Sequence, residues 1–158
     1  MIKTSLALIG LTAFVFASPA LAVDVKKSVD VSVAPDAAWK AIGDFCGIGK
    51  WHPAVAKCEI SNKGGAPLRT LTLKGGGEIM EKQTARDEKG RSYSYAIEKS
   101  PLPVANYGAT LSVAPNGAGS TIVWAAHFDA KGETDAKAGE IIGGIFDAGL
   151  GALKASLK

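Results

Sequence analysis

The chain has little of what reactive centres are usually built from. Its 158 residues include two cysteines and two histidines. Two cysteines alone make a poor metal site, and His52 and His127 show no metal-ligand spacing. Cys46 and Cys58 are also far from the Cys-x-x-Cys spacing of a redox-active pair. The sequence therefore predicts no metal centre and no redox dithiol, and we expect no cofactor.

Clustered positive charge and phosphate-binding motifs are missing as well. The 18 basic and 15 acidic side chains are scattered along the chain, which argues against nucleic acid as the main partner. Residues 47–49 begin like a dinucleotide-binding motif, but His52 occupies the third glycine position. The triple glycine at 75–77 lacks the lysine and hydroxyl residue of a phosphate loop. No Gly-x-Ser-x-Gly motif or internal repeat appears.

The one long apolar run lies at the N-terminus. Residues 6–16 are almost wholly apolar, follow Lys3 and precede the small-x-small sequence at 20–22, a pattern typical of a cleaved signal. The alternative is an uncleaved anchor, but the run is shorter than the ~20 residues of a spanning helix. We therefore interpret 1–22 as a secretory signal peptide. Residues 23–158 then form one domain, periplasmic or secreted, without a membrane span.

Export has a consequence for the two cysteines. An oxidising compartment favours pairing, so we predict a disulfide between Cys46 and Cys58. Closing so short a loop would contribute roughly 3 kcal/mol in the chain-entropy model.

The first part of the domain reads as a strand followed by a helix. Apolar and polar residues alternate over 25–33, which predicts a half-buried strand. Pro35 suits the first turn of a helix, and Asp36 favours the positive end of its dipole. Apolar residues then recur at helical spacing as far as Phe45, before Gly47 and Gly49 end the pattern.

Short strands divided by turn residues fill the middle of the chain. Their regular spacing predicts an antiparallel sheet. The predicted strands are 57–61, 68–74, 78–86, 91–99, 106–114 and 120–129. Within them, residues of one parity are apolar and are expected to be buried: Leu71, Leu73, Tyr93, Tyr95, Ile97, Tyr107, Ala109, Leu111, Val113, Ile122, Trp124, Ala126 and Phe128.

The chain ends in a predicted amphipathic helix from Thr134, a plausible cap, to near Leu157. Five glycines lie inside it, and each costs close to 1 kcal/mol relative to alanine. They are Gly139, Gly143, Gly144, Gly149 and Gly151. Either close backbone approach or a need for room and motion explains such a cost, and the sequence leaves both open.

Both this order of elements and several local motifs point to a known superfamily. The motifs are Ala34-Pro35-Asp36 with Trp39, Gly43-Asp44-Phe45, Trp51-His52-Pro53, Pro101-Leu102-Pro103-Val104 with Tyr107, and Val123-Trp124 with Phe128. In these the chain resembles the START and birch-pollen-allergen-like (SRPBCC) superfamily. Its polyketide cyclase/dehydrase-type branch is the more similar part, and exported MxaD-like proteins the most similar group. The resemblance implies an α+β helix-grip fold, in which a curved antiparallel sheet of about seven strands wraps a long C-terminal helix, with two short helices after the first strand.

A cavity between sheet and terminal helix is the functional feature that the resemblance implies. Trp51, Tyr95, Tyr107, Trp124 and Phe146 are its expected aromatic lining. Plain core packing is the alternative for each of them.

Few side chains are available for acid–base chemistry in such a cavity. His52 lies at the expected cavity mouth and titrates near neutrality, but a turn histidine bonded to a carbonyl is the alternative. Glu81 either points inward to anchor a polar ligand head or carries an ordinary surface charge. Asp44 is a further candidate, whereas His127 has the parity opposite to Trp124 and is expected to leave the cavity.

We therefore predict no catalytic residue. The leading hypothesis is a periplasmic, non-enzymatic binding or helper protein that holds a small apolar or amphipathic ligand. The resemblance to MxaD-like proteins implies an alternative role, assisting a periplasmic quinoprotein (methanol) dehydrogenase and its cytochrome. A polyketide cyclase/dehydrase-like enzyme is the second alternative.

Overall fold

The computed structural model describes residues 22–158. The predicted signal peptide, apart from Ala22, therefore lies outside the described residues. In residues 22–158, no helix is both long and apolar enough to cross a membrane. The elements are β1 (Val23–Val31), α1 (Pro35–Ile42), α2 (Ile48–Trp51), β2 (Val55–Lys63), β3 (Ala66–Leu73), β4 (Glu78–Asp87), β5 (Ser92–Lys99), β6 (Val104–Asn116), β7 (Gly119–Ala130) and α3 (Asp135–Ser156).

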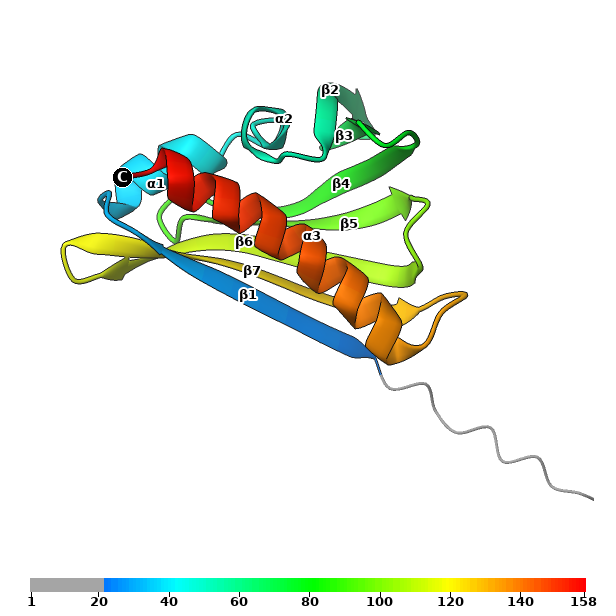
Figure 1. Ribbon diagram of the computed structural model, residues 1–158. Coiled ribbons are helices and arrows are strands. Elements are labelled where there is room, and N and C mark those ends of the chain that lie inside the picture. The colour runs from blue at the N-terminus through cyan, green and yellow to red at the C-terminus, as the bar shows by residue number, and fades with distance from the viewer. Residues whose placement is uncertain (1–21) are drawn as a thin grey trace, which may run out of the picture.

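The strands form one antiparallel sheet in the order β1-β7-β6-β5-β4-β3-β2. The long helix α3 lies across the inner face of this curved sheet, and α1 and α2 lie near the end where α3 finishes (Figure 1). This is the predicted helix-grip fold, with the predicted seven strands and two short helices among the described residues. The strand boundaries agree with those expected to within a few residues.

The first helical segment differs from its prediction. Apolar spacing extends the helix to Phe45, but α1 ends at Ile42 and Phe45 lies in the turn before α2. Gly43 disfavours helix, and the Asp44 carboxylate accepts a hydrogen bond from the Cys46 backbone N–H, which competes with helical pairing. Gly47, predicted to end a helix, instead precedes the first residue of α2 as its N-cap.

The predicted alternation of buried side chains is confirmed along the sheet. Strands β5 and β6 turn their odd-numbered apolar residues toward α3, and β7 turns its even-numbered ones, because successive side chains of a strand point to opposite faces. Leu73 and Ile97 are only half-buried but pack against the same core. The apolar and aromatic residues with no more than 1% of their surface exposed are Ala38, Ile42, Tyr93, Leu111, Ile122, Phe128, Ala138, Ile142, Phe146 and Leu153.

Helix α3 begins at its predicted cap and uses its glycines in two different ways. The Thr134 hydroxyl oxygen accepts a hydrogen bond from the Lys137 backbone N–H at 3.2 Å. A Cβ on Gly149 would lie 2.6 Å from a ring carbon of His52, so this glycine permits close approach. A Cβ on Gly144 would meet nothing within 4 Å. Close approach therefore explains Gly149, whereas no neighbouring atom requires a glycine at position 144.

Candidate functional site

A cavity of about 290 Å³ lies between the inner face of the sheet, the α2 segment and α3. Such a volume is at the lower end of the range of about 300–1,000 Å³ that small-molecule sites occupy. Its lining is mostly aliphatic and aromatic. The lining residues are Ile48, His52, Ala54, Val55, Leu71, Leu73, Gly75, Gly76, Ile79, Glu81, Tyr95, Ile97, Leu102, Tyr107, Trp124, Ile142, Ile145 and Phe146.

The structure places six of the seven predicted ligand-binding residues around this cavity: His52, Glu81, Tyr95, Tyr107, Trp124 and Phe146. Trp51 is the exception. Its half-buried indole packs edge-on against Trp124, with ring centroids 5.7 Å apart, and does not line the cavity. Trp51 is the last residue of helix α2 and His52 is the next residue. The two side chains therefore point in different directions, and the imidazole reaches the cavity while the indole lies beside it. Ligand contact by the other six stays a prediction.

His52 is held by hydrogen bonds at both ring nitrogens. The Ala54 backbone N–H donates to Nδ1 at 3.2 Å, so the ring proton lies on Nε2, which donates to the Ile145 carbonyl at 3.0 Å. Burial lowers the pKa of His52 and keeps the ring neutral, although the bond to Ile145 opposes this shift. The sequence offered two interpretations of His52, a turn residue bonded to a carbonyl and a residue at the cavity. Both describe it, because the ring bonds the Ile145 carbonyl and also lines the cavity.

Glu81 points inward, and a buried arginine neutralises it. Arg69 on β3 stands opposite Glu81 on β4 in the sheet register, and its Nε donates to Glu81 Oε2 at 2.5 Å. Arg69 has no exposed surface and Glu81 is 5% exposed. Burial raises the pKa of Glu81, an effect that the guanidinium partly offsets. Burial disfavours the charge on Arg69, but Glu81, Tyr93 and Tyr95 together outweigh this and the arginine pKa is raised overall.

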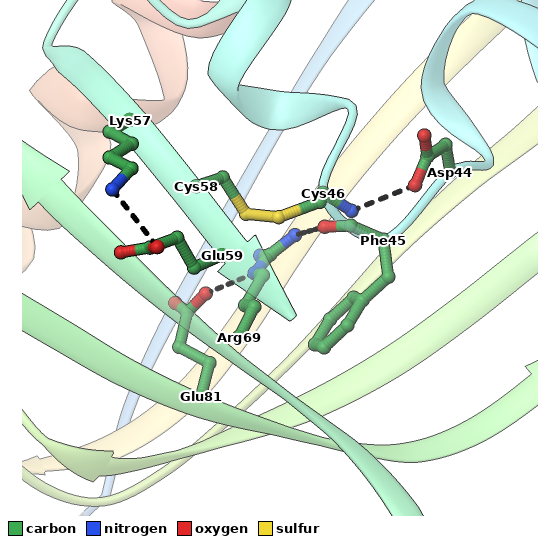
Figure 2. Close-up of a disulfide and its surroundings, with 8 residues drawn as sticks. All are labelled: Asp44, Phe45, Cys46, Lys57, Cys58, Glu59, Arg69 and Glu81. Carbon is green, nitrogen blue, oxygen red and sulfur yellow. Dashed lines mark hydrogen bonds and ion pairs between the residues drawn. A yellow bond between two sulfur atoms is a disulfide. The ribbon is translucent and has the colours of Figure 1, made fainter. Parts of the chain in front are cut away.

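The same arginine anchors the segment between α1 and α2. Its Nη1 donates to the Phe45 carbonyl, and its guanidinium lies 4.2 Å from the Phe45 ring centroid and 4.8 Å from that of Tyr95. Figure 2 shows Arg69 between Phe45 and Glu81, with a disulfide close by. Sequence reasoning missed this residue, although Arg69 shares the parity of Leu71 and that parity already placed it on the buried face.

The disulfide is the predicted one. Cys46, next to Phe45, is bonded to Cys58 on β2, and their Cα atoms are 5.6 Å apart (Figure 2). A second arginine supports the same segment from outside, because Arg86 on β4 donates to the Gly43 carbonyl. Residues 43–46 are therefore held by a covalent bond and by two arginines from the sheet.

Aromatic side chains form the apolar wall of the cavity. The Trp124 and Phe146 rings are stacked with centroids 4.3 Å apart, which joins β7 to α3. The Trp124 Nε1–H donates to the Tyr95 hydroxyl oxygen at 2.9 Å. Burial raises the pKa of Tyr95 and of Tyr107, so both phenols are protonated at neutral pH.

Two other acid–base candidates lie outside the cavity. Asp44 is exposed and accepts the Cys46 N–H, while His127 is exposed, as its parity predicted, and pairs with Asp24 at 2.9 Å. Among residues 22–158, no group of three or more His, Cys, Asp or Glu side chains is arranged to hold a metal ion.

Comparison with protein families assigns the chain. The sequence pattern of the polyketide cyclase / dehydrase and lipid transport family matches residues 22–158. The chain belongs to this family. Membership in the polyketide cyclase / dehydrase and lipid transport family confirms the predicted SRPBCC superfamily. A search of curated proteins gave no significant match in sequence.

Solved structures share the fold of this polyketide cyclase / dehydrase family member. The protein XoxI from Bacillus cereus is 28% identical, with a TM-score of 0.81 over 85% of this chain and 95% of its own. A protein from Thermobifida fusca is 31% identical, with a TM-score of 0.75 over 85% and 92% of the two chains. The Zhui aromatase/cyclase from a Streptomyces species is 18% identical, with a TM-score of 0.70 over 87% and 94%, a likeness of fold alone.

Proposed function

We propose that the protein is an exported carrier or sensor that holds a small apolar or amphipathic molecule in the cavity beneath α3, without catalysing its turnover. The observation that carries this proposal is the cavity itself, whose volume and largely apolar lining suit a small organic ligand. Family membership supports it, because the family description includes lipid transport as well as cyclase and dehydrase activity.

The engagement of the titratable groups supports a binding role over catalysis. Both ring nitrogens of His52 already have backbone partners, and Glu81 is bound to Arg69. A general acid or base must exchange a proton with the substrate, and for His52 that exchange would first break one of these hydrogen bonds.

Export is the second part of the proposal. The apolar N-terminal segment with its small-x-small site has the pattern of a signal peptide. The Cys46–Cys58 disulfide fits an oxidising compartment, in which such bonds persist. The periplasm or the extracellular space is therefore the proposed location.

Native mass spectrometry of the protein purified from a periplasmic extract tests both parts. The expected result is a chain that begins at Val23, is two hydrogen atoms lighter than the reduced form, and releases a stoichiometric small molecule on extraction. A chain that retains residues 1–22 would contradict export. A chain that is empty and shows no binding in a screen of apolar compounds would contradict the carrier role.

Two outcomes of the same work would favour the alternatives. An empty protein that co-purifies with a periplasmic dehydrogenase or its cytochrome would support the helper role. Turnover of aromatic polyketide-like or ester substrates, lost in Glu81→Gln or His52→Ala, would support an enzyme.

A further inference from the structure

The polar groups of the cavity indicate which chemical class it accepts. Among the described residues that line it, Glu81 is the one with a carboxyl group, and the ion pair with Arg69 favours its charged form although burial opposes it. Its Oε2 accepts from Arg69, but the pair is joined through Nε alone, because Arg69 Nη2 has no hydrogen-bond partner. The carboxylate is therefore shared between its counterion and the cavity and is not closed in a bidentate pair.

The balancing cation does not reach the cavity. Arg69 is absent from the lining, has no exposed surface, and its guanidinium packs against the rings of Phe45 and Tyr95. Its Nη2 is also covered by protein atoms. An anion in the cavity would thus meet the negative member of the pair and would find the positive one hidden.

The remaining polar groups favour a neutral hydroxyl. His52 offers no free N–H, since its Nε2–H is bound to the Ile145 carbonyl. Tyr95 and Tyr107 also line the cavity, and a phenolic hydroxyl can both donate and accept, although the Tyr95 oxygen already accepts from Trp124. A hydroxyl can donate to Glu81 and accept from a tyrosine, whereas a carboxylate can only accept and would be repelled by Glu81.

We infer that the ligand is a neutral aromatic alcohol or phenol, and that the cavity discriminates against carboxylic acids of the same size. The hydroxyl would bind the Glu81 carboxylate, and the ring would pack against the stacked pair of Trp124 and Phe146. This inference rests on the proposed binding function and names its ligand class.

Three probes with one ring system separate the possibilities: 2-naphthol, 2-methylnaphthalene and 2-naphthoate. Dissociation constants are measured by equilibrium dialysis at pH 7.5 with the mature, disulfide-bonded protein freed of ligand. A hydrogen bond to a charged group predicts that 2-naphthol binds about 10- to 100-fold more tightly than 2-methylnaphthalene. We expect 2-naphthoate to bind most weakly.

Each contrary ranking has a definite meaning. Equal binding of 2-naphthol and 2-methylnaphthalene would overturn the hydroxyl preference but leave the apolar cavity as a binding site. Tightest binding of 2-naphthoate would overturn the ligand class and identify Arg69 as the anchor. Failure of all three, including the purely apolar probe, would contradict the proposed binding function itself.

A matched pair of variants tests the role of Glu81 in binding the hydroxyl. Glu81→Gln should abolish the preference for 2-naphthol and strengthen 2-naphthoate binding, because the Arg69 charge is then uncompensated. Glu78→Gln removes an exposed carboxylate at the start of the same strand and should leave the ranking unchanged. An unchanged ranking in a folded Glu81→Gln variant would overturn the inference, and the wild-type ranking decides the matter if that variant does not fold.

Discussion

The two walls of the cavity are built by different kinds of interaction. The wall formed by residues 43–52 and β2–β4 is tied by a disulfide, a buried ion pair and hydrogen bonds from arginine to backbone carbonyls. The wall formed by α3 is held by packing, with Gly139 and Gly143 against β1 and Gly149 against the rings of His52 and Trp124. Its ion pair to the sheet, Lys27 with Asp147, is exposed to solvent.

This difference indicates which of the two walls is displaced more easily. Bonds to fixed partners resist displacement as a unit, and losing one partner of a buried pair leaves the other uncompensated. A packed surface is stabilised in proportion to the apolar area it buries, so it can give way by degrees, and an exposed ion pair adds little. We therefore expect α3 to be the adjustable wall and the disulfide side to be the fixed one.

The largest effect should follow loss of the buried cation. Arg69→Met leaves the Glu81 carboxylate buried without its counterion, and we expect a loss of about 3–5 kcal/mol in the free energy of unfolding, measured by urea denaturation. Lys57→Met is the matched control, because the Lys57–Glu59 pair on the same wall is exposed and such pairs contribute about 0–1 kcal/mol. Equal losses in the two variants would contradict the central role of the buried pair.

Removal of the disulfide comes next. Cys46→Ala with Cys58→Ala should cost about 3 kcal/mol in the free energy of unfolding. Hydrogen exchange should accelerate in residues 43–52 more than in α3, since the bond constrains one wall directly. Equal acceleration in both would show that the two walls open together and would remove the distinction between them.

A pair of glycine substitutions probes the packed wall. Gly149→Ala places a methyl group 2.6–3.0 Å from atoms of His52, Trp124 and Trp51, and overpacking of this kind costs about 1–3 kcal/mol. Gly144→Ala meets no atom within 4 Å and should stabilise the helix by up to about 1 kcal/mol. Thermal unfolding compares them, and opposite shifts in Tm are expected. Shifts of the same sign would mean that α3 moves freely enough to absorb the methyl group.

Sequence patterns predicted the fold because buried residues recur every second position along a strand and once per helical turn along a helix. These periods are local, so the strands, their inner faces and α3 were all predicted. The end of α1 was not, because Phe45 keeps the apolar spacing of a helix while Gly43 and Asp44 break it.

The candidate site was predicted in its lining but not in its electrostatics. Parity allows both Glu81 and Arg69 to face inward, yet only the register of β3 with β4 places them opposite each other. That register depends on the geometry of the intervening glycine turn, which composition does not determine. The contact of Gly149 with His52 likewise depends on where α3 crosses the sheet.

The smallest expected effect concerns His52, whose side chain joins the two walls by its hydrogen bond to the Ile145 carbonyl. His52 has a lowered pKa because burial disfavours its charged form, and a proton on Nδ1 would also face the Ala54 N–H that now donates to it. Below the ordinary histidine pKa of about 6.5, the unfolded chain therefore binds more protons at this residue than the folded protein does, so stability should fall as the pH decreases. Urea denaturation from pH 7.5 to 5 should give a flatter profile for His52→Gln than for the wild type. His127→Gln, at an exposed position, is the control substitution. If the His52→Gln profile is as steep as that of the wild type, neither burial nor the Ala54 N–H opposes protonation of His52, and the imidazole does not account for the loss of stability at low pH.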